Sequence, residues 1–117
     1  MLSFGTGTRI FVGIEPVDMR GSFDALAGAV RRMGLDPTDG HLYLFFNRRR
    51  QLCKMISFDG SGFCLFCKRL EKGTFELPSV REGQDRVVVD GAMLSALLSG
   101  IELGAKRRRW YRQEWAA

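Results

Sequence analysis

The chain has 117 residues, 45% of them hydrophobic, and a formal net charge of +5 at pH 7. This length suits one domain with one core, because two cores of useful size need a longer chain, and the positive charge favours a polyanionic partner. No apolar run approaches the roughly 18 residues of a membrane span, and the N-terminus lacks the features of a secretory signal, so we expect a cytoplasmic protein without a membrane partner.

Two elements precede the central part of the chain. Residues 9–14 are a short β-rich run that can add an edge strand to a sheet. Ser22 is placed as a helix N-cap with Asp24 in the first turn, and the spacing of apolar residues predicts a helix over 22–33, which Gly34 ends. The apolar face of this helix is predicted to be Phe23, Leu26, Ala27, Val30 and Met33.

The stretch from 41 to 77 alternates strand-length apolar runs with short polar or glycine turns. This pattern is typical of a four-stranded antiparallel meander, and the Asp59-Gly60 pair is its sharpest turn signal. Because the turns of a meander alternate ends, the turn at 47–50 and the turn at 71–73 should lie at one end of the sheet, roughly 10 Å apart. This arrangement gathers six side chains into what we call the basic edge: Arg48, Arg49, Arg50, Lys68, Arg69 and Lys72.

The remaining elements complete the predicted fold. The fourth strand of the meander is placed at 74–75, and a β-branched run at 86–89 can pair as a further strand. Asp90 can cap a second helix over 90–100, whose apolar face is predicted to be Met93, Leu94, Leu97, Leu98 and Ile101. We therefore predict a single α+β domain, with an antiparallel sheet of about five or six strands. One face is packed by the first helix, and the second helix is a candidate for the same face.

The end of the chain differs in composition from the rest. We place the domain at 1–104 and a basic aromatic tail at 105–117, which carries four of the five net positive charges. Arginines interleaved with aromatic residues are typical of single-strand binders and of arms that reach into grooves. The alternative is a solubilising tail whose tryptophans cover apolar surface. The candidate nucleic-acid contacts in the tail are Lys106, Arg107, Arg108, Arg109, Trp110, Tyr111 and Arg112.

Three blocks of the sequence resemble one known family: residues 18–26, residues 41–45 with the arginine turn after them, and residues 59–75, which are the most specific. Their order and spacing resemble the TnpB-type accessory protein encoded by the second open reading frame of bacterial insertion-sequence family sixty-six, which is unrelated to the RNA-guided nuclease of the same name. The resemblance implies a small cytoplasmic protein that assists transposition beside a separate, larger transposase, which performs the chemistry. One departure lies at 20–22, where Arg-Gly-Ser stands in place of Arg-Lys-Gly, so one basic charge is missing beside the first helix.

Three cysteines and the single histidine invite comparison with a zinc site. Cys64 and Cys67 have the spacing of a metal knuckle, and Cys53 with His41 would complete four ligands. Residues three apart on a strand point to opposite faces, however, whereas paired zinc thiolates usually come from a turn. An odd number of cysteines without a secretion signal is better explained by reduced, buried thiols, so we predict no metal and no cofactor.

Four acidic residues, Asp18, Asp24, Asp59 and Asp90, are candidates for a metal-dependent nuclease site. Such a site would need at least two of Asp18, Asp59 and Asp90 to converge around a metal ion. Asp59 is explained by a turn and Asp90 by a helix cap, and Asp18 can form an ion pair with Arg20. We therefore predict that the chain is not an enzyme.

The predicted function is a non-catalytic accessory factor for DNA transposition, which binds DNA through the basic edge and the tail and has the transposase of the same element as a partner. One alternative is an adaptor that docks the transposase without touching DNA, which a sizeable exposed apolar patch and scattered basic residues would indicate. A small metal-dependent nuclease is the other alternative. The basic edge can also be a solvated hairpin end that guards the sheet, and RNA as ligand and the oligomeric state are left open.

Overall fold

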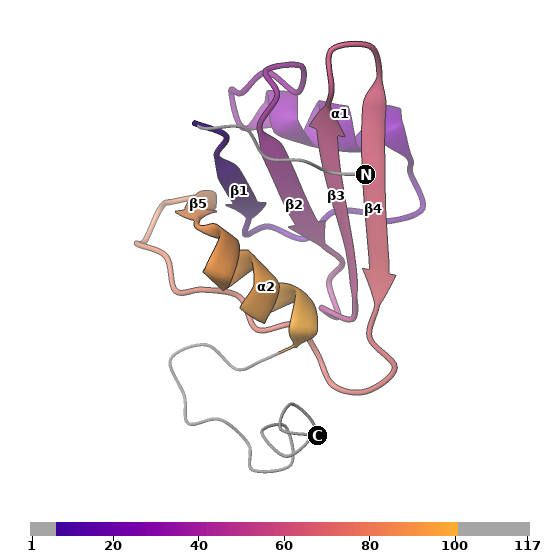
Figure 1. Cartoon of the computed structure of the whole chain (residues 1–117). Helices are drawn as coiled ribbons and strands as arrows, with labels where there is room; N and C mark the ends of the chain where they lie inside the picture. The colour runs from indigo at the N-terminus through magenta and orange to yellow at the C-terminus, as the bar shows by residue number, and fades with distance from the viewer. Residues whose placement is uncertain (1–6, 101–117) are drawn as a thin grey trace.

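Five strands form one sheet in the computed structural model, which describes residues 7–100 (Figure 1). Their order across the sheet is β4-β3-β2-β1-β5. β1 runs parallel to β2, and the other neighbouring pairs are antiparallel, so the sheet is mixed. The bounds of the strands are Ile10–Gly13 for β1, Leu42–Phe46 for β2, Leu52–Phe58 for β3, Phe63–Arg69 for β4 and Arg86–Val89 for β5.

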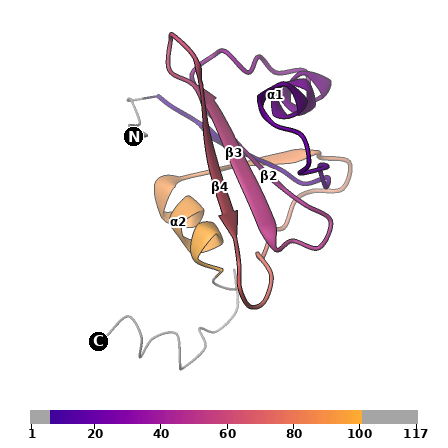
Figure 2. The same cartoon turned by 90° about the vertical axis from the view of Figure 1, so that its right-hand side faces the viewer.

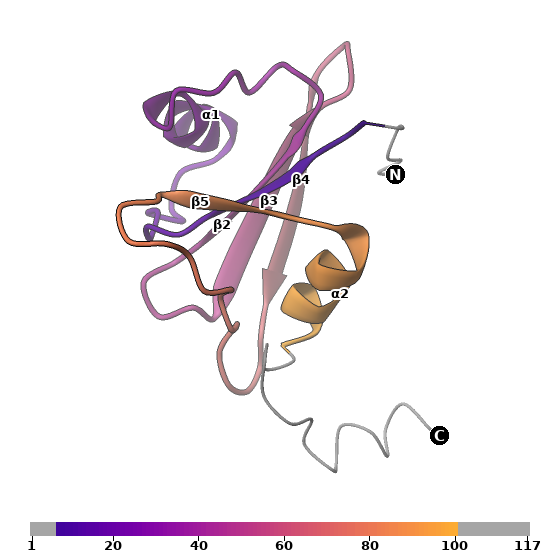
Figure 3. The same ribbon diagram turned by 90° about the vertical axis from the view of Figure 1, so that its left-hand side faces the viewer.

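Two helices cover opposite faces of this sheet, as the side views in Figures 2 and 3 show. Helix α1 (Phe23–Arg32) packs on one face and helix α2 (Gly91–Ser99) on the other. α2 buries Leu94 and Leu97. No helix in the described part of the chain is long and apolar enough to cross a membrane. The side chains that α1 buries are Leu26, Ala27, Ala29 and Val30.

The central strand β2 explains why the sequence in this region is apolar without alternation. Tyr43 and Phe45 pack in the cluster beneath α1, whereas Leu42, Leu44 and Phe46 pack in the cluster beneath α2. All five residues are buried because both faces of the strand are covered. Each large apolar side chain buried in this way contributes roughly 1.5–3 kcal/mol to folding.

The antiparallel meander is confirmed for three strands and wrong for the fourth. Residues 74–75 form no strand. Instead, the Phe75 amide donates a hydrogen bond to the Arg50 carbonyl at 2.6 Å, and its ring is buried against Phe46. The chain thus leaves the edge of β4 and returns to the β2–β3 turn.

The place of β1 in the sheet was also predicted wrongly. β1 is not an edge strand, because it lies between β2 and β5. The long connection through α1 allows β1 and β2 to run parallel, which a short turn cannot do. The run at 86–89 is confirmed as a strand, and it pairs with β1 rather than with the meander.

The helix boundaries are confirmed to within a residue or two, but the two helices do not share a face. Phe23 is 40% exposed, so its assignment to the apolar face of α1 is wrong. Ser22 is the N-cap by position, yet its side chain makes no capping hydrogen bond. Asp90 does cap α2, since its carboxylate accepts a hydrogen bond from the Met93 amide at 2.8 Å. Ile101 lies outside the described residues.

Candidate nucleic-acid interface

The turn between β2 and β3 is built by Asn47. Its side-chain oxygen accepts hydrogen bonds from the amides of Gln51 and Leu52 at 3.0 and 3.1 Å, and its carbonyl accepts one from the amide of Arg50 at 3.0 Å. Arg50 takes a left-handed conformation with φ of +56°, which closes the turn. With the backbone fixed in this way, the three consecutive arginines at 48–50 project from the end of the sheet and are exposed.

The segment after β4 lies against this turn, which confirms that the first and third predicted turns share one end of the sheet. The Leu70 amide donates to the Gln51 carbonyl at 2.8 Å, beside the bond from Phe75 to Arg50. Figure 1 shows this end at the bottom, with the β3–β4 turn projecting at the top. The structure therefore places the six residues of the basic edge at one end of the sheet.

The six side chains differ in how freely they can bind a ligand. The three arginines of the turn and Lys72 are exposed. Arg69 is also exposed and lies 3.6 Å from Glu71, a surface pair that contributes little to stability. Lys68 is different, because its ammonium donates to the Leu98 carbonyl at 2.7 Å and so neutralises the negative end of α2. Lys68 remains a predicted DNA contact, but its ammonium already makes one hydrogen bond within the protein.

The last described residue, at the end of α2, also lies at this end of the sheet. A Cβ atom on Gly100 would lie 3.5 Å from Leu70 Cδ1, so the last described residue lies next to the segment that follows β4. The predicted contacts from Lys106 to Arg112 lie outside the described residues.

The loop between β1 and α1 adds an arginine that the sequence argument left out of the site. Asp18 and Arg20 form an ion pair at 2.7 Å, which confirms the local pairing considered for Asp18. Hydrogen bonds from the side chain and the amide of Arg20 lower the pKa of Asp18 to about 2. The signal in the sequence is the Asp-x-Arg spacing in the loop before the first helix, which indicates the ion pair but not its position beside the arginine turn.

The acidic residues proposed for a nuclease do not converge. Asp59 accepts hydrogen bonds from the amides of Ser61 and Gly62, both at 3.0 Å, in the β3–β4 turn at the end of the sheet opposite the basic edge. Asp90 caps α2, and Asp18 is paired with Arg20. Among residues 7–100, no group of three His, Cys, Asp or Glu side chains is placed to hold a metal ion.

The cysteines occupy separate environments. Cys64 and Cys67 project from opposite faces of β4, as alternation along a strand requires. Cys53 is buried beneath α2, and burial raises the pKa of its thiol to about 11. The ring of His41 is engaged elsewhere, since its Nδ1 accepts a hydrogen bond from the Arg9 amide at 3.0 Å.

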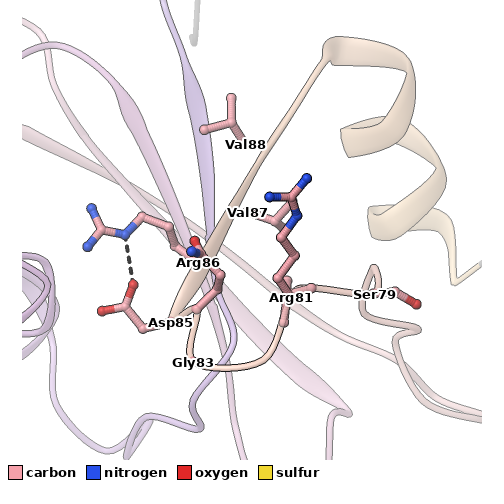
Figure 4. Close-up of a pocket in the computed structure, with 9 residues that line it drawn as sticks. Ser79, Arg81, Gly83, Asp85, Arg86, Val87 and Val88 are labelled. Atoms are coloured by element: carbon pink, nitrogen blue, oxygen red, sulfur yellow. Dashed lines mark hydrogen bonds and ion pairs between the residues drawn. The ribbon is translucent and has the colours of Figure 1, made fainter.

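A hollow of about 790 Å³ lies between β5 and the loop before it (Figure 4). Arg86, which lines this hollow, already binds other groups of the protein, because its guanidinium pairs with Asp85 at 2.8 Å and donates to the Met33 carbonyl at 2.6 Å. In this view Arg81 lies on the other side of β5 from that pair. The charged groups of this hollow therefore do not converge, and the basic edge is the better candidate for an anionic ligand.

Comparison with known proteins places the chain in a family. The family model for IS66 Orf2-like proteins matches residues 8–108. The uncharacterized protein y4hO of Sinorhizobium fredii is 40% identical over 111 residues, which cover 94% of this chain and 95% of that protein. The uncharacterized protein y4jC of the same organism is 32% identical over 110 residues, which cover 93% and 92% respectively. No solved structure matches the chain. The chain therefore belongs to the family of IS66 Orf2-like proteins.

Proposed function

We propose that the chain is a non-catalytic accessory protein for transposition of an insertion sequence, and that it binds DNA through the basic edge and the tail. Membership of the IS66 Orf2-like family supports the link to transposition. The transposase of the same element is the partner beside which it would act. One observation carries the proposed contact with DNA: the arginine turn, the segment after β4 and the last described residue meet at one end of the sheet.

The chemistry of that end suits a phosphate backbone. Five of the six cationic side chains of the basic edge are exposed, and four of them are arginines, whose planar guanidinium groups can bind phosphate oxygens in pairs. Glu71 is the acid that pairs within the edge, at 3.6 Å from Arg69. Contacts of this kind position a protein on DNA without reading bases, so we expect binding with little sequence preference.

The structure gives less support to an adaptor that does not touch DNA. Within residues 7–100, the large hydrophobic side chains that are exposed are Phe23 and Val88, one on α1 and the other on β5. The basic residues of the edge are clustered rather than scattered. Both features favour DNA as the ligand.

The test is a binding experiment with charge-matched variants. Labelled duplex DNA is titrated with the full-length chain and with an Arg48→Ala, Arg49→Ala, Arg50→Ala triple variant, between about 50 and 200 mM salt. Loss of three phosphate contacts should weaken binding and make the slope of log K against log salt shallower by roughly 2.7. A matched control removes three exposed arginines that line neither the turn nor the cleft beside it: Arg9, Arg31 and Arg81.

The outcomes separate a specific edge from net charge. A shallower slope for the turn variant and a nearly unchanged slope for the control would support the proposal. Equal effects of both variants on binding would show that the basic edge contributes only through the net charge of the protein, and would contradict a specific contact there. If the wild-type chain binds neither duplex nor single-stranded DNA at low salt, the proposal is wrong and direct docking to the transposase becomes the account to test.

A further inference from the structure

A cleft beside the arginine turn carries charges that the predicted basic edge did not include. It has a volume of about 580 Å³, and its two walls are the loop between β1 and α1 and the turn between β2 and β3. Three of its lining residues are arginines, Arg20, Arg48 and Arg49, and one is an acid, Asp18. The lining therefore has an excess of two positive charges.

The loop that forms one wall is held in place by bonds to the sheet. The Val17 amide donates to the Phe46 carbonyl at 2.9 Å, where β2 ends. The ammonium of Lys54, on β3, donates to the carbonyls of Met19 and Gly21 at 2.7 and 3.0 Å. These bonds join residues 29 to 35 positions apart in the sequence and fix the cleft before any ligand binds. A preformed site spends less free energy on ordering when its ligand arrives.

Within the loop, Asp18 orients the guanidinium of Arg20. Its carboxylate accepts hydrogen bonds from Nε at 3.0 Å and from Nη2 at 2.7 Å, and it also accepts one from the Arg20 amide at 2.9 Å. A guanidinium has five N–H groups, so three of those of Arg20 are left to bind a ligand. The side chain of Arg20 is 91% exposed. The hydrogen bonds from Arg20 lower the pKa of Asp18 to about 2, so the pair stays ionised in mildly acidic solution as well as at neutral pH.

We infer that this cleft is a phosphodiester-binding site, in which Arg20 acts together with Arg48 and Arg49 and Asp18 is the positioning residue of Arg20. The inference rests on the proposed function and adds to it a fixed contact on the opposite wall from the arginine turn. The ligand class is the phosphate backbone of DNA. A phosphodiester carries one negative charge, and its non-bridging oxygens can accept hydrogen bonds from the guanidinium groups that line the cleft.

The test compares single variants in the full-length chain. Arg20→Ala is expected to weaken binding of labelled duplex roughly five- to tenfold near 0.1 M salt and to lower the salt slope by roughly 0.9, the value for one phosphate contact. Arg31→Ala is the matched control, since Arg31 is an exposed arginine on α1 that does not line the cleft. It should leave affinity and slope nearly unchanged.

A double-mutant cycle tests the positioning role of Asp18. Asp18→Asn is expected to weaken binding about twofold in the wild-type background, although it adds a net positive charge, and to change nothing when Arg20→Ala is present. Tighter binding in both backgrounds would show that Asp18 acts only as a negative charge, and would overturn the positioning role. Inorganic phosphate is the competing probe, compared with chloride at equal ionic strength.

The other outcomes decide between the cleft and the wider proposal. If the triple variant of the arginine turn loses affinity while Arg20→Ala behaves like Arg31→Ala, the cleft is not a site and the proposed function stands. If Arg20→Ala leaves the affinity for DNA unchanged but abolishes binding of inorganic phosphate, the cleft binds free phosphate and the assignment to a phosphodiester is overturned. If the wild-type chain binds no DNA, both proposals fall.

Discussion

Replacing Lys54 by methionine should loosen the loop between β1 and α1. The substitution keeps most of the apolar stem of the side chain and removes the ammonium. That ammonium donates two hydrogen bonds, at 2.7 Å to the Met19 carbonyl and at 3.0 Å to the Gly21 carbonyl. Both carbonyls belong to a loop that is tied to the rest of the fold by few other bonds, so their loss should be felt in stability and in binding.

The magnitude follows from these two bonds. Hydrogen bonds to a charged group are worth roughly 1.5–3 kcal/mol each. The site is part-buried, so water takes over a share of the lost bonds, and we expect a fall of about 2 kcal/mol in the free energy of unfolding. Affinity for DNA should fall as it does for Arg20→Ala, because Arg20 lies in the released loop.

Urea denaturation followed by circular dichroism measures the first effect. The midpoint should move to lower urea with an unchanged m-value, since the surface exposed on unfolding is the same. Lys72→Met is the control, because Lys72 is exposed, and its effect should stay within about 0.5 kcal/mol. A change for Lys54→Met no larger than that of the control would refute the anchoring role of Lys54.

Two further predictions concern α2 and the cysteines. Asp90→Ala removes the hydrogen bond that caps α2 and should lower the free energy of unfolding by about 1 kcal/mol, whereas Asp90→Ser should recover most of it; equal losses in the two variants would argue against capping. Iodoacetamide should modify Cys67, which is exposed, long before Cys53, which is buried and whose pKa burial raises to about 11, so that its thiolate is scarce. Mass spectrometry of the labelled peptides gives the order, and equal rates in the folded protein would contradict the burial of Cys53.

The features that the sequence predicted well are local ones. Asp59 and Gly60 formed the expected turn because their signal lies within four residues: the Asp59 carboxylate accepts amide bonds from the turn, and Gly60 takes φ of +101°. Asp90 was recognised as a cap for the same reason. The antiparallel order of β2, β3 and β4 followed from the short turns between them.

The features that were missed depend on contacts between distant parts of the chain. No local pattern indicates that residues 10–12 pair with residues 42–44 in parallel, because the helix between them permits either an edge or an internal position. The apolar run of β2 fits a strand buried on both faces, and it was the sign that a second helix covers the other face. Phe75 has the sequence features of a strand residue, but its amide donates a hydrogen bond to the Arg50 carbonyl in the arginine turn instead.

The candidate site shows the same division. The gathering of the basic edge was predictable, because turn alternation in a meander places the two turns together. Lys68 looked like a free cation on β4, and the contact that engages it comes from Leu98, 30 residues away. The position of Arg20 in the cleft could not be predicted either. It depends on the hydrogen bonds from Lys54, on β3, to the loop between β1 and α1.

The most direct test of DNA binding at this end of the sheet is an amide NMR titration of the labelled protein with a short duplex. The account predicts that shifts concentrate in three segments: residues 17–21, residues 47–51 and residues 69–73. The β3–β4 turn at 59–62, at the other end of the sheet, serves as the internal control and should stay unchanged. Shifts centred on 59–62 or on the hollow at 79–88, with none in those three segments, would contradict the central claim.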